Sequence, residues 1–146
     1  TVFDAGYGIH FEKGDSASTS FVLFADKDGD EKFNGAFGTV YDKTGCFAGA
    51  EATKECLQVF LVPRENKIEK FCAVRAISES EECNTDGTPL VFLDILFHRP
   101  DPDAILRTNL SVGDPGRYQR AHIRFISPQG VTGQVEVGNT GQISVK

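Results

Sequence analysis

The stretch Phe21-Val22-Leu23-Phe24-Ala25 is apolar at every position, and it decides the fold class. A strand with one wet face alternates polar and apolar side chains, whereas a strand covered on both faces does not. The run therefore predicts a central strand that is covered on each side. The sequence offers one helix candidate, Ala48 to Glu55, which is short and contains Gly49. We therefore expect a covering helix from a segment before Thr1.

Strands are predicted along most of the remaining chain. Alternating or apolar segments bounded by turn residues lie at 7–12, 20–25, 56–62, 67–74, 90–97, 121–126, 134–137 and 142–145. Residues 26–50 and 99–119 are predicted to be loops, and three prolines, Pro100, Pro102 and Pro115, favour this for the second segment. These patterns predict one mainly β, antiparallel domain over residues 1–146, a length that suits a single core.

Charge and hydropathy narrow the class of protein. Fifteen Lys and Arg residues against 21 Asp and Glu residues give a formal net charge of -6, which disfavours nucleic acid and anionic lipid surfaces as partners. The sequence has no signal peptide and no apolar run long enough to span a membrane. It begins at Thr1 and contains no Met, which indicates a processed product or a part of a longer chain.

Four cysteines lie close together in the sequence, at Cys46, Cys56, Cys72 and Cys83. None forms the C-x-x-C pair that is typical of zinc or thioredoxin-like chemistry. An even number of cysteines in a small domain favours disulfides, and disulfides favour a place outside the cytoplasm. Three pairings are open. We favour Cys46 with Cys56 and Cys72 with Cys83, because each pair closes a short loop rich in turn-forming or polar residues.

The segment from Asp26 to Asn34 carries the strongest chemical signal. Carboxylates at alternate positions followed by an amide oxygen can surround Ca²⁺, which prefers oxygen ligands. We predict a weak calcium site with the ligands Asp26, Asp28, Asp30 and Asn34.

This segment starts like an EF-hand loop and then departs from it. Glu31 stands at the sixth position instead of Gly, and Phe37 stands at the twelfth instead of the bidentate Glu. A complete EF-hand is therefore excluded. The alternative to calcium is a solvated acidic turn in which Gly29 or Gly35 adopts a positive φ.

No catalytic constellation is evident, and we expect that the protein is not an enzyme. Gly14-Asp15-Ser16 resembles the surroundings of a serine nucleophile, and His10, His98 and His122 are candidate bases. No G-x-S-x-G motif is present, and a polar turn explains Gly14-Asp15-Ser16 better. We assign none of these histidines to catalysis.

The segment His98-Arg99-Pro100-Asp101-Pro102-Asp103 follows an apolar strand and contains two prolines that stiffen it. Arg99, Asp101 and Asp103 are candidate contacts for a partner protein. The simpler alternative is an ordered loop in which Arg99 pairs with Asp101 or Asp103 at the surface.

Several stretches together resemble the GspH/FimT group of minor pseudopilins and pilins. They are Gly6 to Phe11, Phe21 to Asp26, Phe97 to Pro102, Ile126 to Gly130 and Val135 to Val145. Individually these motifs are short and loose, but their order along nearly the whole chain carries the resemblance.

The resemblance implies a pilin-like β-domain that is α+β in the full-length protein, with the N-terminal helix missing here. It implies a structural subunit of a type IV pilus or a type II secretion machine, whose partners are other pilins or pseudopilins. No small-molecule substrate is expected, and the missing helix would be the membrane anchor. The subunit would lie in a pilus, at the cell surface or on the periplasmic face of the inner membrane.

The second candidate function is an adhesive or DNA-binding module at a pilus tip. The candidate residues for a local basic patch are Arg107, Arg117, Arg120 and Arg124, all in the last third of the chain.

Overall fold

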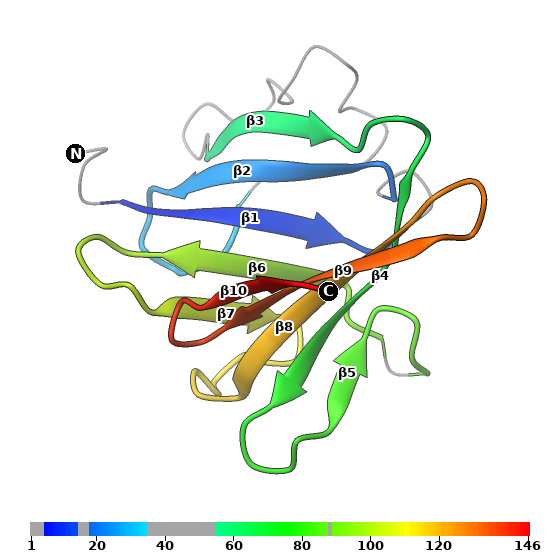
Figure 1. Cartoon of the computed structure of the whole chain (residues 1–146). Helices are drawn as coiled ribbons and strands as arrows, with labels where there is room; N and C mark the ends of the chain where they lie inside the picture. The colour runs from blue at the N-terminus through cyan, green and yellow to red at the C-terminus, as the bar shows by residue number, and fades with distance from the viewer. Residues whose placement is uncertain (1–4, 15–17, 35–54, 88) are drawn as a thin grey trace.

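A computed structural model describes residues 5–14, 18–34, 55–87 and 89–146. These residues form ten strands in two five-stranded antiparallel sheets (Figure 1). The first sheet contains, in spatial order, β3 (Cys56–Leu61), β2 (Ser20–Asp26), β1 (Gly6–Glu12), β6 (Phe92–Phe97) and β7 (Ala104–Thr108). The second contains β10 (Ile143–Val145), β9 (Thr132–Gly138), β8 (Tyr118–Ile126), β4 (Lys67–Arg75) and β5 (Glu81–Cys83).

The strands of the second sheet run obliquely across the first sheet (Figure 1). Backbone hydrogen bonds outside the ladders connect the two sheets. The amide of Ile68, in β4, donates to the carbonyl of Ser18, and the amide of Ala104, in β7, donates to the carbonyl of Asn139. The main core lies between the sheets, where Phe71 and Ile123 of the second sheet join Leu93 and Leu106 of the first.

The mainly β prediction is confirmed, and β2 is an inner strand of its sheet as predicted, but it is not covered on both faces. It pairs with β1 on one side and with β3 on the other, so it is not an edge strand. On one of its faces Val22 and Phe24 are fully buried in a second cluster with Phe33. On the other face Phe21 and Leu23 are only half-buried. One face of β2 is therefore fully covered and the other is not.

The prediction of a loop over 99–119 is wrong at β7. In this strand Ala104, Leu106 and Thr108 are buried while the residues between them are half-buried, the period-2 pattern of a strand with one face on the core. The prolines on both sides of the segment concealed this short pattern. The three-residue strand β5 was also missed.

The proposed helix over 48–55 lies outside the described residues, apart from Glu55. None of the residues that the structure describes forms a helix of the length and hydrophobicity needed to cross a bilayer.

Candidate functional site

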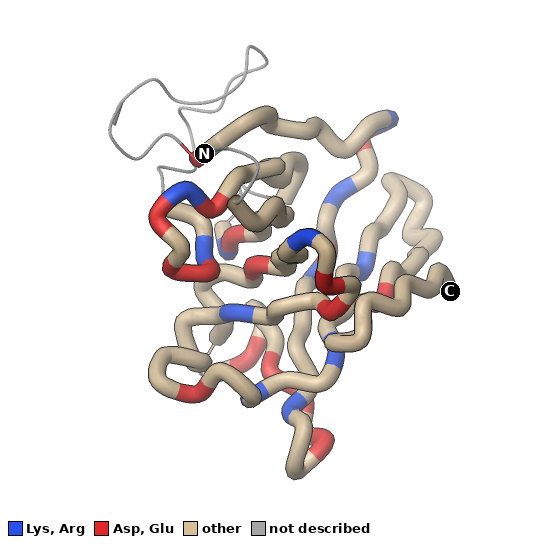
Figure 2. The backbone as a smooth tube through the Cα atoms, turned by 90° about the vertical axis from the view of Figure 1, so that its left-hand side faces the viewer, with Lys and Arg blue, Asp and Glu red and all other residues tan. Residues whose placement is uncertain are grey.

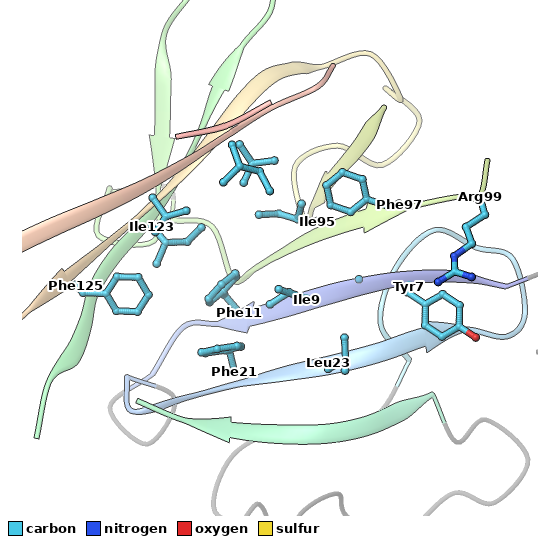
Figure 3. Close-up of a pocket in the computed structure, with 14 residues that line it drawn as sticks. Tyr7, Ile9, Phe11, Phe21, Leu23, Ile95, Phe97, Arg99, Ile123 and Phe125 are labelled. Carbon is cyan, nitrogen blue, oxygen red and sulfur yellow. The ribbon is translucent and has the colours of Figure 1, made fainter. Parts of the chain in front are cut away.

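An apolar groove with a volume of about 540 Å³ opens between the two sheets. Strands β1, β2 and β6 supply one wall, and β8, β9 and β10 supply the other (Figure 3). The lining residues are Tyr7, Gly8, Ile9, Phe11, Phe21, Leu23, Ile95, Phe97, Arg99, Ile123, Phe125, Val135, Val137 and Ile143.

The groove continues the main core between the sheets, because four residues belong both to that core and to the groove lining, namely Phe11, Ile95, Ile123 and Val137. Aromatic packing stabilises the wall formed by β1 and β2, where the ring centroids of Phe11 and Phe21 lie 5.5 Å apart. Ile9 on one wall and Ile143 on the other are 36% and 60% exposed. A contiguous apolar surface of this kind is typical of a contact site for another apolar element.

Tyr7 and Arg99 lie at one end of the groove, where they contribute a hydroxyl group and a guanidinium group to its lining (Figure 3). Arg99 is exposed, and no ion pair joins it to Asp101, Asp103 or another described residue in this structure. Asp101 instead accepts a hydrogen bond from the backbone amide of Asp103. Arg99 is therefore the one predicted contact residue that lies in the groove, while Asp101 and Asp103 are exposed beside it.

The acidic segment folds into a compact turn after β2. The buried carboxylate of Asp26 accepts hydrogen bonds from the backbone amides of Gly29, Asp30 and Glu31. Gly29 has a φ of 77°, as predicted, and Glu31 also adopts a positive φ of 65°. The glutamate at the sixth position therefore takes the left-handed conformation that glycine supplies in an EF-hand loop.

Glu55 joins this turn from the start of β3 and was not predicted. It is almost fully buried, and its carboxylate accepts hydrogen bonds from the backbone amides of Lys27 and Asn34. Oxygen atoms of Asp26, Asp28, Asp30 and Glu55 lie within 4.8 Å of one another. The side-chain nitrogen of Asn34 donates to Asp28 and Asp30, so in this arrangement Glu55, and not Asn34, supplies the fourth inward-facing oxygen.

Burial and repulsion from neighbouring carboxylates disfavour the charged forms of Glu55 and Asp26, whereas hydrogen bonds outweigh the effect of burial on Asp28 and lower its pKa. Burial raises the pKa of Glu55 to about 7, and the charge of Asp28 adds to the effect. Burial also raises the pKa of Asp26, with further contributions from Asp28 and Asp30. A divalent cation would reverse this penalty.

The cysteine predictions are confirmed where the structure describes them. Cys72 and Cys83 form a disulfide between the adjacent strands β4 and β5. Cys56 is also disulfide-bonded. Cys46, which we paired with it from the sequence, lies outside the described residues.

The histidines do not assemble a nucleophilic site with the described residues. His10 is buried beside the fully buried Asp94, at 2.5 Å between Nδ1 and Oδ1. His122 is buried on β8 and contacts Glu81 at 3.1 Å. Asp15 and Ser16 lie outside the described residues. The buried pair of His10 and Asp94 gave no sequence signal, because 84 residues separate its members.

All four arginines of the suggested basic patch face carboxylates. Arg107 pairs with Glu31, Arg117 with Glu82 and Asp114, Arg120 with Glu136, and Arg124 with Glu69. Acidic and basic residues are interspersed along the chain (Figure 2). These arginines therefore do not combine into an unopposed positive surface. Comparisons with protein families, with curated proteins and with solved structures find no match to this chain.

Proposed function

We propose that the chain is the β-domain of a minor pilin or pseudopilin, a structural subunit that acts by assembling with other pilins. The observation that carries this proposal is the apolar groove between the sheets. The resemblance to the GspH/FimT group implies an N-terminal helix, and a helix needs an apolar surface on which to pack.

The apolar lining of the groove suits the apolar face of a helix as its occupant. A helix with its side chains is about 10–12 Å across and presents an apolar stripe. The groove offers apolar side chains on both walls, from Leu23 and Ile95 on one sheet to Ile123 and Val135 on the other. The outer half of the pilin helix would fill it, and the inner half would anchor the subunit in the membrane and bundle with other pilin helices.

The disulfides support a location outside the cytoplasm, since such bonds persist mainly in oxidising compartments. A pilus, the cell surface or the periplasmic face of the inner membrane agrees with this chemistry. The machine would be a type IV pilus or a type II secretion system, and the partners would be other pilins or pseudopilins.

Co-expression of the complete gene product with the other pilins encoded beside it tests the proposal. The parent protein should co-purify with at least one of them. Leu23→Arg, which puts a charge on the groove wall, should abolish co-purification. Ile77→Arg is the matched control, because Ile77 is 94% exposed and lies outside the groove, and it should behave like the parent. Absence of any pilin from the parent preparation would refute the proposal.

The alternative, a DNA-binding module at a pilus tip, has less support, because its candidate arginines are paired with carboxylates. Fluorescence anisotropy with labelled duplex DNA at low salt separates the two functions. We expect no binding up to high micromolar protein. Binding that weakens steeply with salt would favour the alternative.

A further inference from the structure

A second cluster of chemical groups surrounds the Cys72–Cys83 disulfide. Cys72 lies directly opposite Cys83 on β5 and directly opposite His122 on β8. Their neighbours Phe71 and Ile123 point into the core between the sheets, so Cys72 and His122 point to the other face of the second sheet. Three adjacent strands thus place two sulfurs and an imidazole in one row.

Glu81 completes this cluster from the same face of β5. Its Oε1 atom lies 3.2 Å from Sγ of Cys83, and its Oε2 atom lies 3.1 Å from Nε2 of His122. Sγ of Cys72, a carboxylate oxygen of Glu81 and a ring nitrogen of His122 lie within 4.8 Å of one another. Ligand atoms of a tetrahedral zinc ion lie about 3.3–3.8 Å apart, so side-chain movements of about 1 Å would bring these three atoms to a ligand spacing.

His122 is the buried imidazole of this cluster, with a side chain that is 7% exposed. Its Nε2 atom faces Glu81, and its Nδ1 atom has no hydrogen-bond partner among the described residues. Nε2 is therefore the ring nitrogen placed to bind a cation beside Glu81, and imidazole nitrogen is a preferred ligand of zinc.

We propose that reduction of the Cys72–Cys83 disulfide converts this cluster into a zinc site with Cys72, Cys83, His122 and Glu81 as ligands. A protein dithiol would donate two electrons and two protons, so that its own disulfide forms as the Cys72–Cys83 bond breaks. Zn²⁺ would then displace the two thiol protons to solvent and bind both thiolates. The cluster would thus alternate between a disulfide and a metal as its cross-link. This proposal does not depend on the pilin assignment.

Cobalt provides the direct test, because Co²⁺ replaces Zn²⁺ and reports thiolate ligands by a charge-transfer band in the near ultraviolet. The full chain, reduced with a phosphine that leaves no competing thiol, should show this band, and the oxidised chain should not. Zinc should bleach the band and raise the melting temperature of the reduced chain. His122→Asn and Glu81→Gln should each weaken zinc binding at least tenfold in a chelator competition.

Two controls separate this site from the other cysteines and from general effects. Cys46→Ser with Cys56→Ser should keep the cobalt band, whereas Cys72→Ser should remove it. Glu79→Gln, an exposed change in the neighbouring turn, should keep full affinity. A reduced chain that binds no zinc, whether folded or unfolded by circular dichroism, would overturn the proposal. Equal zinc affinity in His122→Asn and the parent would overturn it as well.

Discussion

Among single residues, His10 has the most unusual environment in the described chain. Its burial alone would lower its pKa, but the hydrogen bond to Asp94 and the nearby carboxylate of Glu12, 3.6 Å from Nε2, outweigh that effect and raise the pKa to about 9. Asp94 is fully buried, and its carboxylate also accepts a hydrogen bond from the backbone amide of Phe33. The imidazolium and the carboxylate therefore join β1 and β6 to the backbone at Phe33, which follows the acidic turn.

This pair predicts a specific dependence of stability on pH. A histidine with a raised folded pKa stabilises the fold fully below its unfolded pKa of about 6.5, and this contribution is lost as pH rises through about 9. At about 1.4 kcal/mol per pKa unit, up to about 3 kcal/mol should disappear over this window. Urea unfolding of the parent and of His10→Gln between pH 6 and pH 9.5 measures it.

The His10→Gln variant should lose most of the slope over that range. His98→Gln, a change at a half-buried histidine outside this pair, should retain it. Parallel curves for the parent and His10→Gln would show that the pair is not charged in the folded state.

Gly8 is a second residue that the fold constrains closely. A Cβ atom at this position would lie 2.7 Å from the carbonyl oxygen of Ile95 and 2.8 Å from the ring of Phe24. The carbonyl belongs to the neighbouring strand β6 and cannot move without disturbing the ladder. Gly8→Ala should therefore destabilise the fold by about 1–3 kcal/mol in urea unfolding. Gly133→Ala, also within a strand but with open space around its Cβ, should change stability by less than about 1 kcal/mol.

At the scale of elements, the acidic turn after β2 is the part of the fold whose stability calcium binding would change. An EF-hand loop has a glutamate at its twelfth position, where this sequence has Phe37. In the structure Glu55, just before β3, supplies a carboxylate beside the three aspartates instead. Calcium binding at this turn stays a prediction; the ligands predicted from the sequence are Asp26, Asp28, Asp30 and Asn34, and the structure places Glu55 beside the three aspartates. Because clustered carboxylates repel one another once they are ionised, the effect of calcium on stability should depend on pH.

Calcium should raise the melting temperature more at pH 8 than at pH 5. The folded pKa of Glu55 lies above its unfolded value, so ionising this carboxyl destabilises the fold as pH rises from about 4.5 to about 7. Calcium binds the ionised form and offsets that loss. At a hundred times its dissociation constant it would add about 2.7 kcal/mol. Thermal scans in calcium and in chelator at both pH values provide the measurement.

Glu55→Gln should remove most of the calcium-dependent shift. Asp103→Asn, which removes an exposed carboxylate away from the turn, should leave the shift unchanged. Identical melting curves in calcium and in chelator at pH 8 would rule out the site.

The sequence predicted most elements because most strands carry their own signal. The five apolar residues from Phe21 identified a central strand, and the alternation from Ala121 to Ile126 located the C-terminal part of β8. β7 was missed because prolines on both sides conceal its short period, and β5 was missed because two of its three residues are glutamates. Their stability comes from the ladder with β6 and β4, which is a tertiary contact.

The sites were harder to predict than the elements, since they depend on register. Asp26, Asp28 and Asp30 are neighbours in the sequence and were found. Glu55 approaches them only after β3 pairs with β2, and His122 reaches Cys72 only through the pairing of β4 with β8. No local pattern contains these contacts.

For the whole molecule, the open groove is the feature with the largest expected effect in solution. Its walls expose apolar atoms of Ile9 and Ile143, while the net charge of -6 opposes association between copies. We therefore expect the 146-residue chain to be monomeric by light scattering and to bind a hydrophobic dye such as anilinonaphthalene sulfonate. Large oligomers or filaments of this chain alone would contradict the role assigned to a helix in assembly.

Paired substitutions determine whether the dye reports the groove. Leu23→Gln replaces an apolar side chain in the groove wall with a polar one, and it should reduce dye fluorescence severalfold while the chain stays folded by circular dichroism. Ile77→Gln removes a more exposed apolar side chain outside the groove and should leave the fluorescence unchanged. A synthetic amphipathic helix should displace the dye from the parent but not alter the weak signal of Leu23→Gln. Equal fluorescence from the two variants would mean that the groove is closed in solution, and a closed groove could not receive the helix on which assembly is proposed to depend.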